Sequence, residues 1–136
     1  MPSDMKILWA GGVVPQYGQV AIWDAETDQY PEWTTGNEKA CATDHCVVVA
    51  TRPDWGQTGA QGVAVEVWTG TQPPKDEGFR RVFIGLLVVG GHGVRVGNHP
   101  SGDLHDLAIP NGCHLLEVWT DIDFGGPSNV QFRFPR

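Results

Sequence analysis

The chain has 136 residues, of which 40% are hydrophobic and 18% charged, and this composition excludes a disordered chain and a coiled coil. The length suits one domain and is too short for two. Nine basic residues against sixteen acidic ones give a net charge of −7, and the only adjacent cations are Arg80 and Arg81, so we expect no direct binding of nucleic acid.

The predicted elements are β-strands, because short apolar runs recur between clusters of Gly, Pro, Asp and Asn while helical periodicity is nearly absent. The stretch 24–42 is the one place where a helical turn fits. The elements predict an all-β, single-domain antiparallel β-sandwich that spans residues 1–136, with about eight or nine short strands and at most one short helix. In chain order, strands are expected near residues 5–9, 18–24, 45–51, 62–69, 81–89, 93–97, 104–109, 112–120 and 129–134.

Hydrophobic patterning assigns faces to some of these strands. Residues 63–68 alternate cleanly, with three valines on one face and Glu66 on the other. Residues 82–89 are apolar on both faces, so we expect this strand at the centre of a sheet or between two layers. The Gly-rich stretch 90–93 and the Pro-Asn-Gly stretch 110–112 are predicted turns, each joining the strands beside it in a hairpin.

The chain carries no pattern of a membrane or secreted protein. Its longest apolar run, residues 82–89, is far short of the roughly 18 residues that a membrane-spanning helix needs. The first ten residues lack a secretory signal, and three cysteines are an odd, low count for a disulfide-stapled domain. We therefore expect a cytoplasmic protein with no membrane partner.

Two histidines and two carboxylates form the strongest candidate for a metal site. They lie within eight residues, but the stretch is a loop entering a strand, where such residues usually form turns or face solvent. A likeness to a cupin motif fails because asparagine is absent at position 109. We therefore predict no metal, no cofactor and no catalytic residue. The four weak candidates are His99, Asp103, His105 and Asp106.

Six tryptophans are the most informative aromatic residues. Trp68 and Trp119 share strand parity with Glu66 and Glu117, so each is expected on the less buried face of its sheet. We favour packing at a sheet end over an exposed interface anchor for both. For Trp33 and Trp55, which lie in loops beside prolines, the two interpretations are balanced.

The main candidate for a binding surface is the acidic segment 24–33, which has interleaved aromatic residues, together with the acidic stretch 121–123 elsewhere in the chain. One interpretation is a solvated loop, which composition alone favours. The other is an acidic surface that occupies the basic groove of a nucleic-acid enzyme. The candidate partner-binding residues are Asp24, Glu26, Asp28, Tyr30, Glu32, Trp33, Asp121 and Asp123.

A sequence pattern that runs roughly from Tyr17 to Thr120, with both ends of the chain unmatched, resembles the competence protein J family. The closest part is Leu107-x-x-Pro110-x-Gly112-x-x-x-Leu116-x-x-Trp119-Thr120, and Tyr17-x-Gln19, Trp33-Thr34 and Gly93-Val94 precede it. The resemblance implies a small cytoplasmic β-rich protein that binds and inhibits a DNA-entry nuclease and has no catalytic activity. The shared residues are expected to be structural: Tyr17, Gln19, Pro110, Gly112, Trp119 and Thr120.

The leading hypothesis is a non-enzymatic inhibitor or immunity-type protein whose acidic, aromatic-bearing loops contact a basic protein such as a nuclease. The alternatives are a β-sandwich that binds a small molecule or carbohydrate through tryptophans, and a cupin-like metal enzyme that uses His99 and His105. The oligomeric state stays open.

Overall fold

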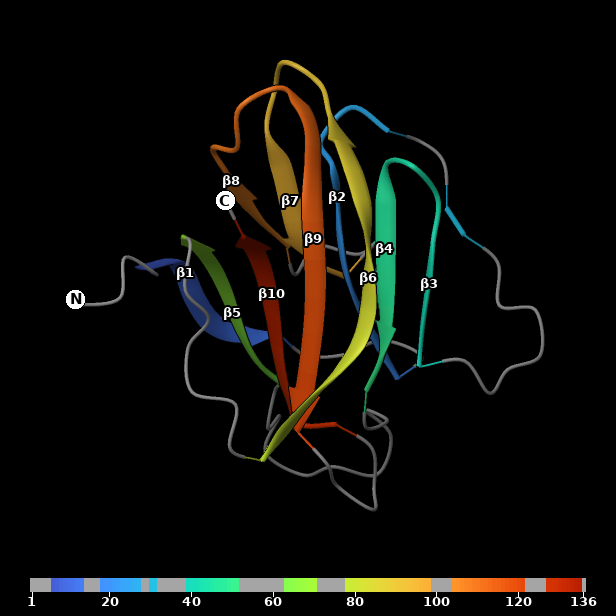
Figure 1. The fold of residues 1–136 in the computed structure, drawn as a ribbon, viewed down its shortest axis with the longest axis vertical. Helices are drawn as coiled ribbons and strands as arrows, with labels where there is room; N and C mark the ends of the chain where they lie inside the picture. The colour runs from blue at the N-terminus through green and yellow to red at the C-terminus, as the bar shows by residue number, and fades with distance from the viewer. Residues whose placement is uncertain are drawn as a thin grey trace.

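The computed structural model contains ten β-strands and no helix among the residues it describes (Figure 1). These residues are 6–13, 18–27, 30–31, 39–51, 63–70, 78–98, 104–121 and 127–135. The strands are β1 (Lys6–Val13), β2 (Gln19–Asp24), β3 (Ala40–Ala42), β4 (Cys46–Ala50), β5 (Val63–Gly70), β6 (Phe79–Val89), β7 (Val94–Gly97), β8 (Leu104–Leu107), β9 (Gly112–Asp121) and β10 (Asn129–Pro135).

The strands form two five-stranded sheets. Sheet A has the order β1-β5-β10-β9-β6, and sheet B has the order β3-β4-β2-β7-β8. All neighbouring strands are antiparallel except β5 and β10, which run parallel. The predicted all-β class is confirmed, with one parallel pair that the strand spacing did not indicate.

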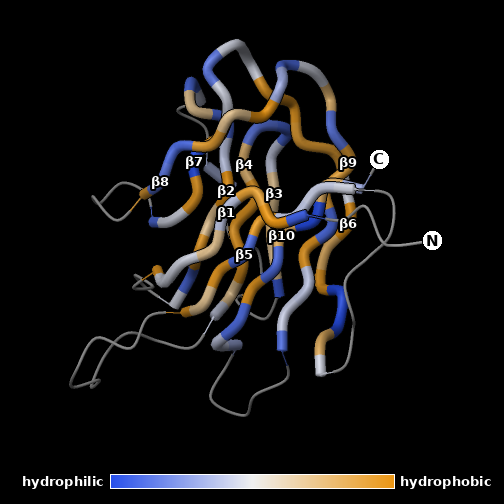
Figure 2. Tube along the Cα trace, turned by 90° about the vertical axis from the view of Figure 1, so that its left-hand side faces the viewer, coloured by the Kyte–Doolittle hydropathy of each residue, from blue (hydrophilic) through white to orange (hydrophobic). Residues whose placement is uncertain are grey.

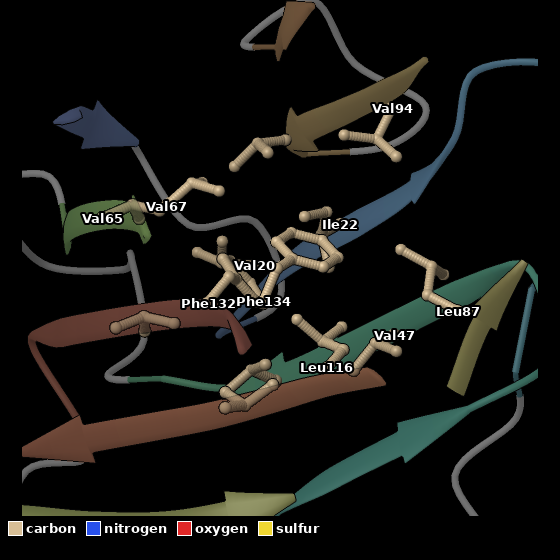
Figure 3. Packing of buried hydrophobic residues seen from close by; sticks show 14 of the residues in the cluster. Val20, Ile22, Val47, Val65, Val67, Leu87, Val94, Leu116, Phe132 and Phe134 are labelled. Atoms are coloured by element: carbon tan, nitrogen blue, oxygen red, sulfur yellow. The ribbon is translucent and has the colours of Figure 1, made fainter. Parts of the chain in front are cut away.

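The hydrophobic core lies between the two sheets and is built by strand alternation. In β5 the side chains of Val63, Val65 and Val67 are fully buried, whereas Ala64 is exposed. Val20, Ile22 and Val47 of sheet B meet residues of sheet A in the same layer (Figure 3). Figure 2 shows hydrophobic and hydrophilic residues interspersed along the strands, as a sheet with one core-facing side requires.

The predicted central position of residues 82–89 is wrong, because β6 lies at an edge of sheet A. Leu87 and Val89 point into the core, but Ile84 and Leu86 are exposed on the outer face. The strands that are buried on both faces are instead β10 of sheet A and β2 and β4 of sheet B. In β2 and β4 the outward side is closed by further hydrophobic residues. Their outward residues form a second cluster, made of Ala21, Trp23, Cys46 and Val48 with Tyr30, Cys41 and Leu104 packed against it.

The two predicted hairpins are also wrong, although both turns exist. Residues 90–93 connect β6 of sheet A to β7 of sheet B, and residues 110–112 follow β8 of sheet B and lead into β9 of sheet A. Each turn therefore carries the chain between the sheets instead of between neighbouring strands. Gly93 has a φ of 77°, and a Cβ there would meet the carbonyl oxygen of Leu107 at 2.3 Å, so this crossing needs glycine.

The predicted helical turn within 24–42 falls partly on residues 28–29 and 32–38, which lie outside the described residues. The described end of this stretch is extended, since Ala40–Ala42 forms the short strand β3 against β4. The structure contains no disulfide among the three described cysteines, Cys41, Cys46 and Cys113. No helix in the described part of the chain is long and apolar enough to cross a membrane.

Candidate functional site

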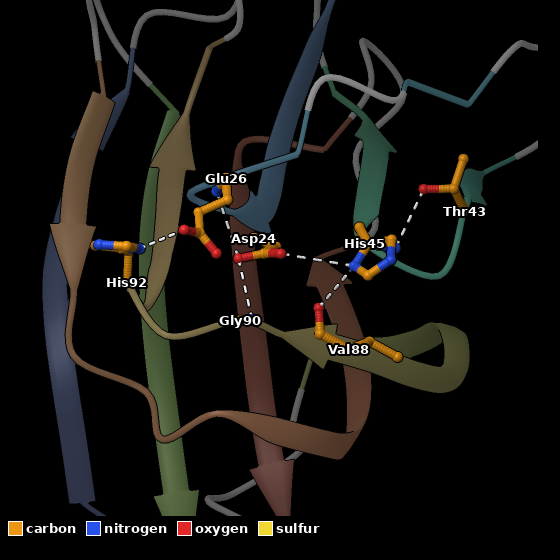
Figure 4. A network of polar contacts seen from close by, with 7 residues as sticks. All are labelled: Asp24, Glu26, Thr43, His45, Val88, Gly90 and His92. Carbon is orange, nitrogen blue, oxygen red and sulfur yellow. Dashed lines mark hydrogen bonds and ion pairs between the residues drawn. The ribbon is translucent and has the colours of Figure 1, made fainter.

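The acidic segment begins where β2 ends, and its first carboxylate is buried. Asp24 is only 5% exposed, and its Oδ1 accepts hydrogen bonds from the backbone N–H of Glu26 (3.4 Å) and of Gly90 (3.2 Å). Gly90 follows the last residue of β6. Asp24 therefore ties the end of β2 in sheet B to the end of β6 in sheet A (Figure 4).

His45 joins the turn between β3 and β4 to the same place. Its Nδ1 lies 3.1 Å from the carbonyl oxygen of Val88 and 3.6 Å from Oδ2 of Asp24. Its backbone N–H donates to Oγ1 of Thr43 at 3.2 Å. Three connecting segments thus converge on one buried carboxylate, which fixes their relative positions.

Glu26 and His92 form the exposed part of this group of residues. Oε1 of Glu26 contacts Nδ1 of His92, and both side chains are about half or more exposed. A Cβ at Gly90 would lie 2.6 Å from Oε2 of Glu26, so the glycine leaves room for this carboxylate. We call Asp24, Glu26, His45, Gly90 and His92 the loop-end cluster.

No group of three or more His, Cys, Asp or Glu side chains in the described residues has an arrangement that could hold a metal ion. Oδ1 of Asp24 already accepts hydrogen bonds from two backbone N–H groups, and Oε1 of Glu26 already contacts Nδ1 of His92. Glu26 is the exposed carboxylate of the cluster, and it is held by the contact with His92 and by the hydrogen bond from its backbone N–H to buried Asp24.

The weak metal candidates lie elsewhere. The ring of His105 packs on that of Trp9 with centroids 4.6 Å apart, and Asp106 accepts a hydrogen bond from Nε of Arg95 at 2.9 Å. His99 and Asp103 lie outside the described residues.

The structure separates the candidate partner-binding residues. Asp24 lies near Gly90 at one end of β6, whereas Asp121 pairs with Phe79 at the other end. Tyr30 packs beside buried Trp23, with ring centroids 6.5 Å apart. The remaining candidates lie outside the described residues: Asp28, Glu32, Trp33 and Asp123.

Asp121, the last residue of β9, bonds to the residues at the start of β10. Its two carboxylate oxygens accept four hydrogen bonds of 2.9–3.0 Å from the backbone and side chains of Ser128 and Asn129. Partial burial acts to raise the pKa of Asp121, but these hydrogen bonds outweigh it and hold the pKa below its ordinary value.

A second polar group covers the outer face of sheet A, and the sequence indicated only part of it. Trp68 and Trp119 are half-buried there, as strand parity predicted, and each indole N–H donates to a glutamate on its own strand, Glu66 at 3.3 Å and Glu117 at 2.9 Å. Between them, β10 contributes two buried polar side chains. We call the set the outer-face cluster: Glu66, Trp68, Glu117, Trp119, Gln131 and Arg133.

The residues of the predicted structural motif are spread over the fold. Gln19 begins β2, Gly112 begins β9 with a φ of 131°, and the Pro110 carbonyl oxygen lies 2.6 Å from Nε2 of His114. Trp119 faces outward, and the next residue, Thr120, is fully buried in the core. Tyr17 lies outside the described residues.

Comparison with solved structures finds the same architecture in a known protein. The chain has the fold of ComJ. The crystal structure of ComJ from Bacillus subtilis, an inhibitor of the DNA-degrading activity of NucA, superposes with a TM-score of 0.68 over 98% of both chains. The two sequences are 14% identical, so the likeness is one of fold. No family profile matches this chain, and no curated protein matches its sequence.

Proposed function

We propose that this protein is a non-enzymatic binding protein that inhibits a nuclease. The observation that carries the proposal is the likeness to ComJ over nearly the whole of both chains, because ComJ inhibits the DNA-degrading activity of NucA. The proposed site of action is the cytoplasm, and the proposed partner is a basic protein.

The loop-end cluster supports an acidic contact surface. Glu26 and Asp44 are exposed at this end of the molecule, and their segments are anchored by buried Asp24 and by His45. With a net charge of −7, the whole chain attracts a basic nuclease at long range. Fixed loops also reduce the ordering cost of binding.

The experiment measures DNA cleavage by NucA, and by nuclease activity in an extract of the host, with increasing amounts of the protein. Glu26→Lys reverses an exposed charge in the loop-end cluster, and Asp106→Lys makes the same charge change on β8 as a matched control. We expect wild type and Asp106→Lys to suppress cleavage, and Glu26→Lys to need about tenfold more protein or above. Undiminished cleavage by both nuclease sources in excess wild-type protein would refute the proposal.

A second candidate, a carbohydrate-binding face, rests on the outer-face cluster. A groove of about 380 Å³ borders it, lined in part by Glu66, Asn129 and Gln131. Trp68 and Trp119 belong to the same cluster and offer aromatic surface for stacking on sugar rings, although neither lines the groove. However, the indole N–H groups and Gln131 bond within the cluster, so we rank this function second. Quenching of tryptophan fluorescence by a saccharide panel tests it.

A further inference from the structure

Strand β6 is an edge strand, with β9 as its one neighbour in sheet A, and it has two features that are unusual at an edge. It is 11 residues long, and its outward side chains are apolar in the middle. Ile84 and Leu86 are 50% and 57% exposed, and Leu115, opposite Leu86 on β9, is 40% exposed. Natural edges are usually blunted by charges, proline or bulges, because an open strand pairs with other chains.

The protective features of β6 lie at one end only. Arg80 and Arg81 are there, together with a bulge between Arg81 and Phe83. Residues 83–87 contain neither charge nor proline. The central part of this edge is therefore left without the usual protection.

The backbone of this central part is oriented for pairing. The N–H of Val88 donates to the carbonyl oxygen of Asp44 at 2.8 Å, and its own carbonyl oxygen lies 3.1 Å from Nδ1 of His45. The backbone N–H and C=O of Val88 thus point away from β9. In a strand the backbone N–H and C=O of every second residue point to the same side, so those of Ile84 and Leu86 also point away from β9.

The other described edges are shorter or covered. Trp9 of β1 packs on His105 of β8, which joins these two edges to each other. Strand β3 has only three residues. Among the described strands, β6 is therefore the edge best suited to extend a sheet.

The charges at the two ends of β6 favour a second copy of this chain as its partner. Arg80 lies near the start of the strand, and the exposed carboxylate of Glu26 lies beside Gly90 just beyond its end. A twofold axis reverses the strand direction, so it places the basic end of one copy against the acidic end of the other. The strand is self-complementary in charge, in hydrophobicity and in backbone direction.

We propose that β6 pairs antiparallel with β6 of a second copy of this chain, joining the two A sheets into one. The paired residues are 83–87 of each copy, with Ile84 of one copy opposite Leu86 of the other. The pairing stops before Val88, because the backbone N–H and carbonyl oxygen of Val88 already contact Asp44 and His45. The two pairs of exposed side chains, with Leu115 beside them, bury one another on the outer face. This inference does not depend on nuclease inhibition.

The test is sedimentation equilibrium of purified protein over a wide concentration range, with thermal melts to check folding. We expect wild type to reach twice the monomer mass. Leu86→Lys and Ile84→Pro should raise the dimer dissociation constant about tenfold or more. Ile84→Pro spares the β9 ladder, since the N–H it removes points away from β9. Arg80→Glu changes only an exposed residue and should also weaken the dimer, most strongly at low salt.

Ile7→Lys is the matched control, because Ile7 is 44% exposed on β1 at the opposite edge of the same sheet. It should leave the dimer intact. A monomeric wild type, a dimer that persists in folded Leu86→Lys and Arg80→Glu, or a dimer lost in folded Ile7→Lys would each overturn the proposal.

Discussion

The guanidinium carbon of Arg133 lies 4.2 Å from the centre of the Trp119 indole ring, on the outer face of sheet A. Arg133 is only 2% exposed, and its Nε and one terminal nitrogen donate to Oε1 of Gln131 at 3.0 and 2.7 Å. A charge buried on an outer face is costly unless it is paired. The cation–π contact with the tryptophan ring and the two hydrogen bonds to the amide oxygen offset part of this cost.

The position of Arg133 explains a repeated tetrapeptide in the sequence. Glu66-Val67-Trp68-Thr69 lies on β5 and Glu117-Val118-Trp119-Thr120 on β9, the two neighbours of β10. Because β5 is parallel and β9 antiparallel to β10, Arg133 lies opposite Trp68 on one side and Glu117 on the other. Both copies of the repeat thus flank the same buried cation.

Arg133→Ala should lower the free energy of unfolding by about 2–4 kcal/mol, because it removes two charge-assisted hydrogen bonds and the contact with Trp119. Arg133→Lys keeps the charge but loses the planar fork, so its loss should be smaller. Urea denaturation followed by tryptophan fluorescence measures both. Arg95→Ala, which breaks the exposed pair with Asp106, is the control and should cost about 0–1 kcal/mol. Equal losses for Arg133→Ala and Arg95→Ala would contradict this role.

Thr120→Val should stabilise the fold by about 1 kcal/mol. Thr120 is fully buried, and its hydroxyl has no hydrogen-bond partner among the described residues. Valine has nearly the same shape and removes the cost of that buried polar atom. Thr69→Val is the matched control on β5: the Thr69 hydroxyl donates to the carbonyl oxygen of Phe134 at 3.3 Å, so its loss should destabilise. Thermal melts that rank the two variants in the reverse order would exclude this account.

Cys46 should resist thiol reagents at pH 8 while exposed Cys113 reacts rapidly. Burial raises the pKa of the Cys46 thiol from 9.0 to about 12, with a smaller contribution from Cys41, so little of the reactive thiolate forms at pH 8 in the folded state. Mass spectrometry after labelling checks the order of reaction. Labelling of Cys46 as fast as of Cys113 in the folded protein would show that the thiol is accessible.

The same shift predicts how stability changes in alkali. The folded state holds the Cys46 proton to higher pH than the unfolded state, so stability falls as pH rises from about 9 towards 12, by about 1.4 kcal/mol per pH unit. Cys46→Ala should flatten this part of the curve. An unchanged slope in that variant would assign the loss to other groups.

Asp121→Asn should lower the free energy of unfolding by about 1–2 kcal/mol, because an amide cannot accept all four hydrogen bonds from Ser128 and Asn129. The folded pKa of Asp121 lies below its unfolded value of 3.8. Its contribution is therefore present above that pH and is lost as pH falls through the folded pKa. Acid titration followed by circular dichroism should show this step in wild type and a reduced step in Asp121→Asn, whereas Asp106→Asn should retain it.

Local patterning was enough to predict the fold class and most strands. Alternation over 63–68 placed the valines of β5 inward and Glu66 and Trp68 outward, and the structure agrees. Short strands such as β3 carry too few residues to show a period, so Ala40–Ala42 was missed.

Long-range arrangement was beyond the sequence pattern. The apolar run in β6 predicted a central strand, but part of its outer face is exposed instead of covered. The turns at 90–93 and 110–112 have hairpin chemistry, yet local sequence does not say whether a turn stays in one sheet. His45 and His92 were not candidates because only the fold brings them to the acidic residues.

The inhibition of NucA-catalysed DNA cleavage, titrated with this protein at low and high ionic strength, tests the central proposal most directly. Nuclease inhibition through an acidic surface predicts that cleavage is suppressed and that the inhibition constant rises with salt, since exposed charge pairs are screened. Cleavage that continues unchanged at low salt in excess of this protein, with NucA and with host nuclease alike, would contradict it.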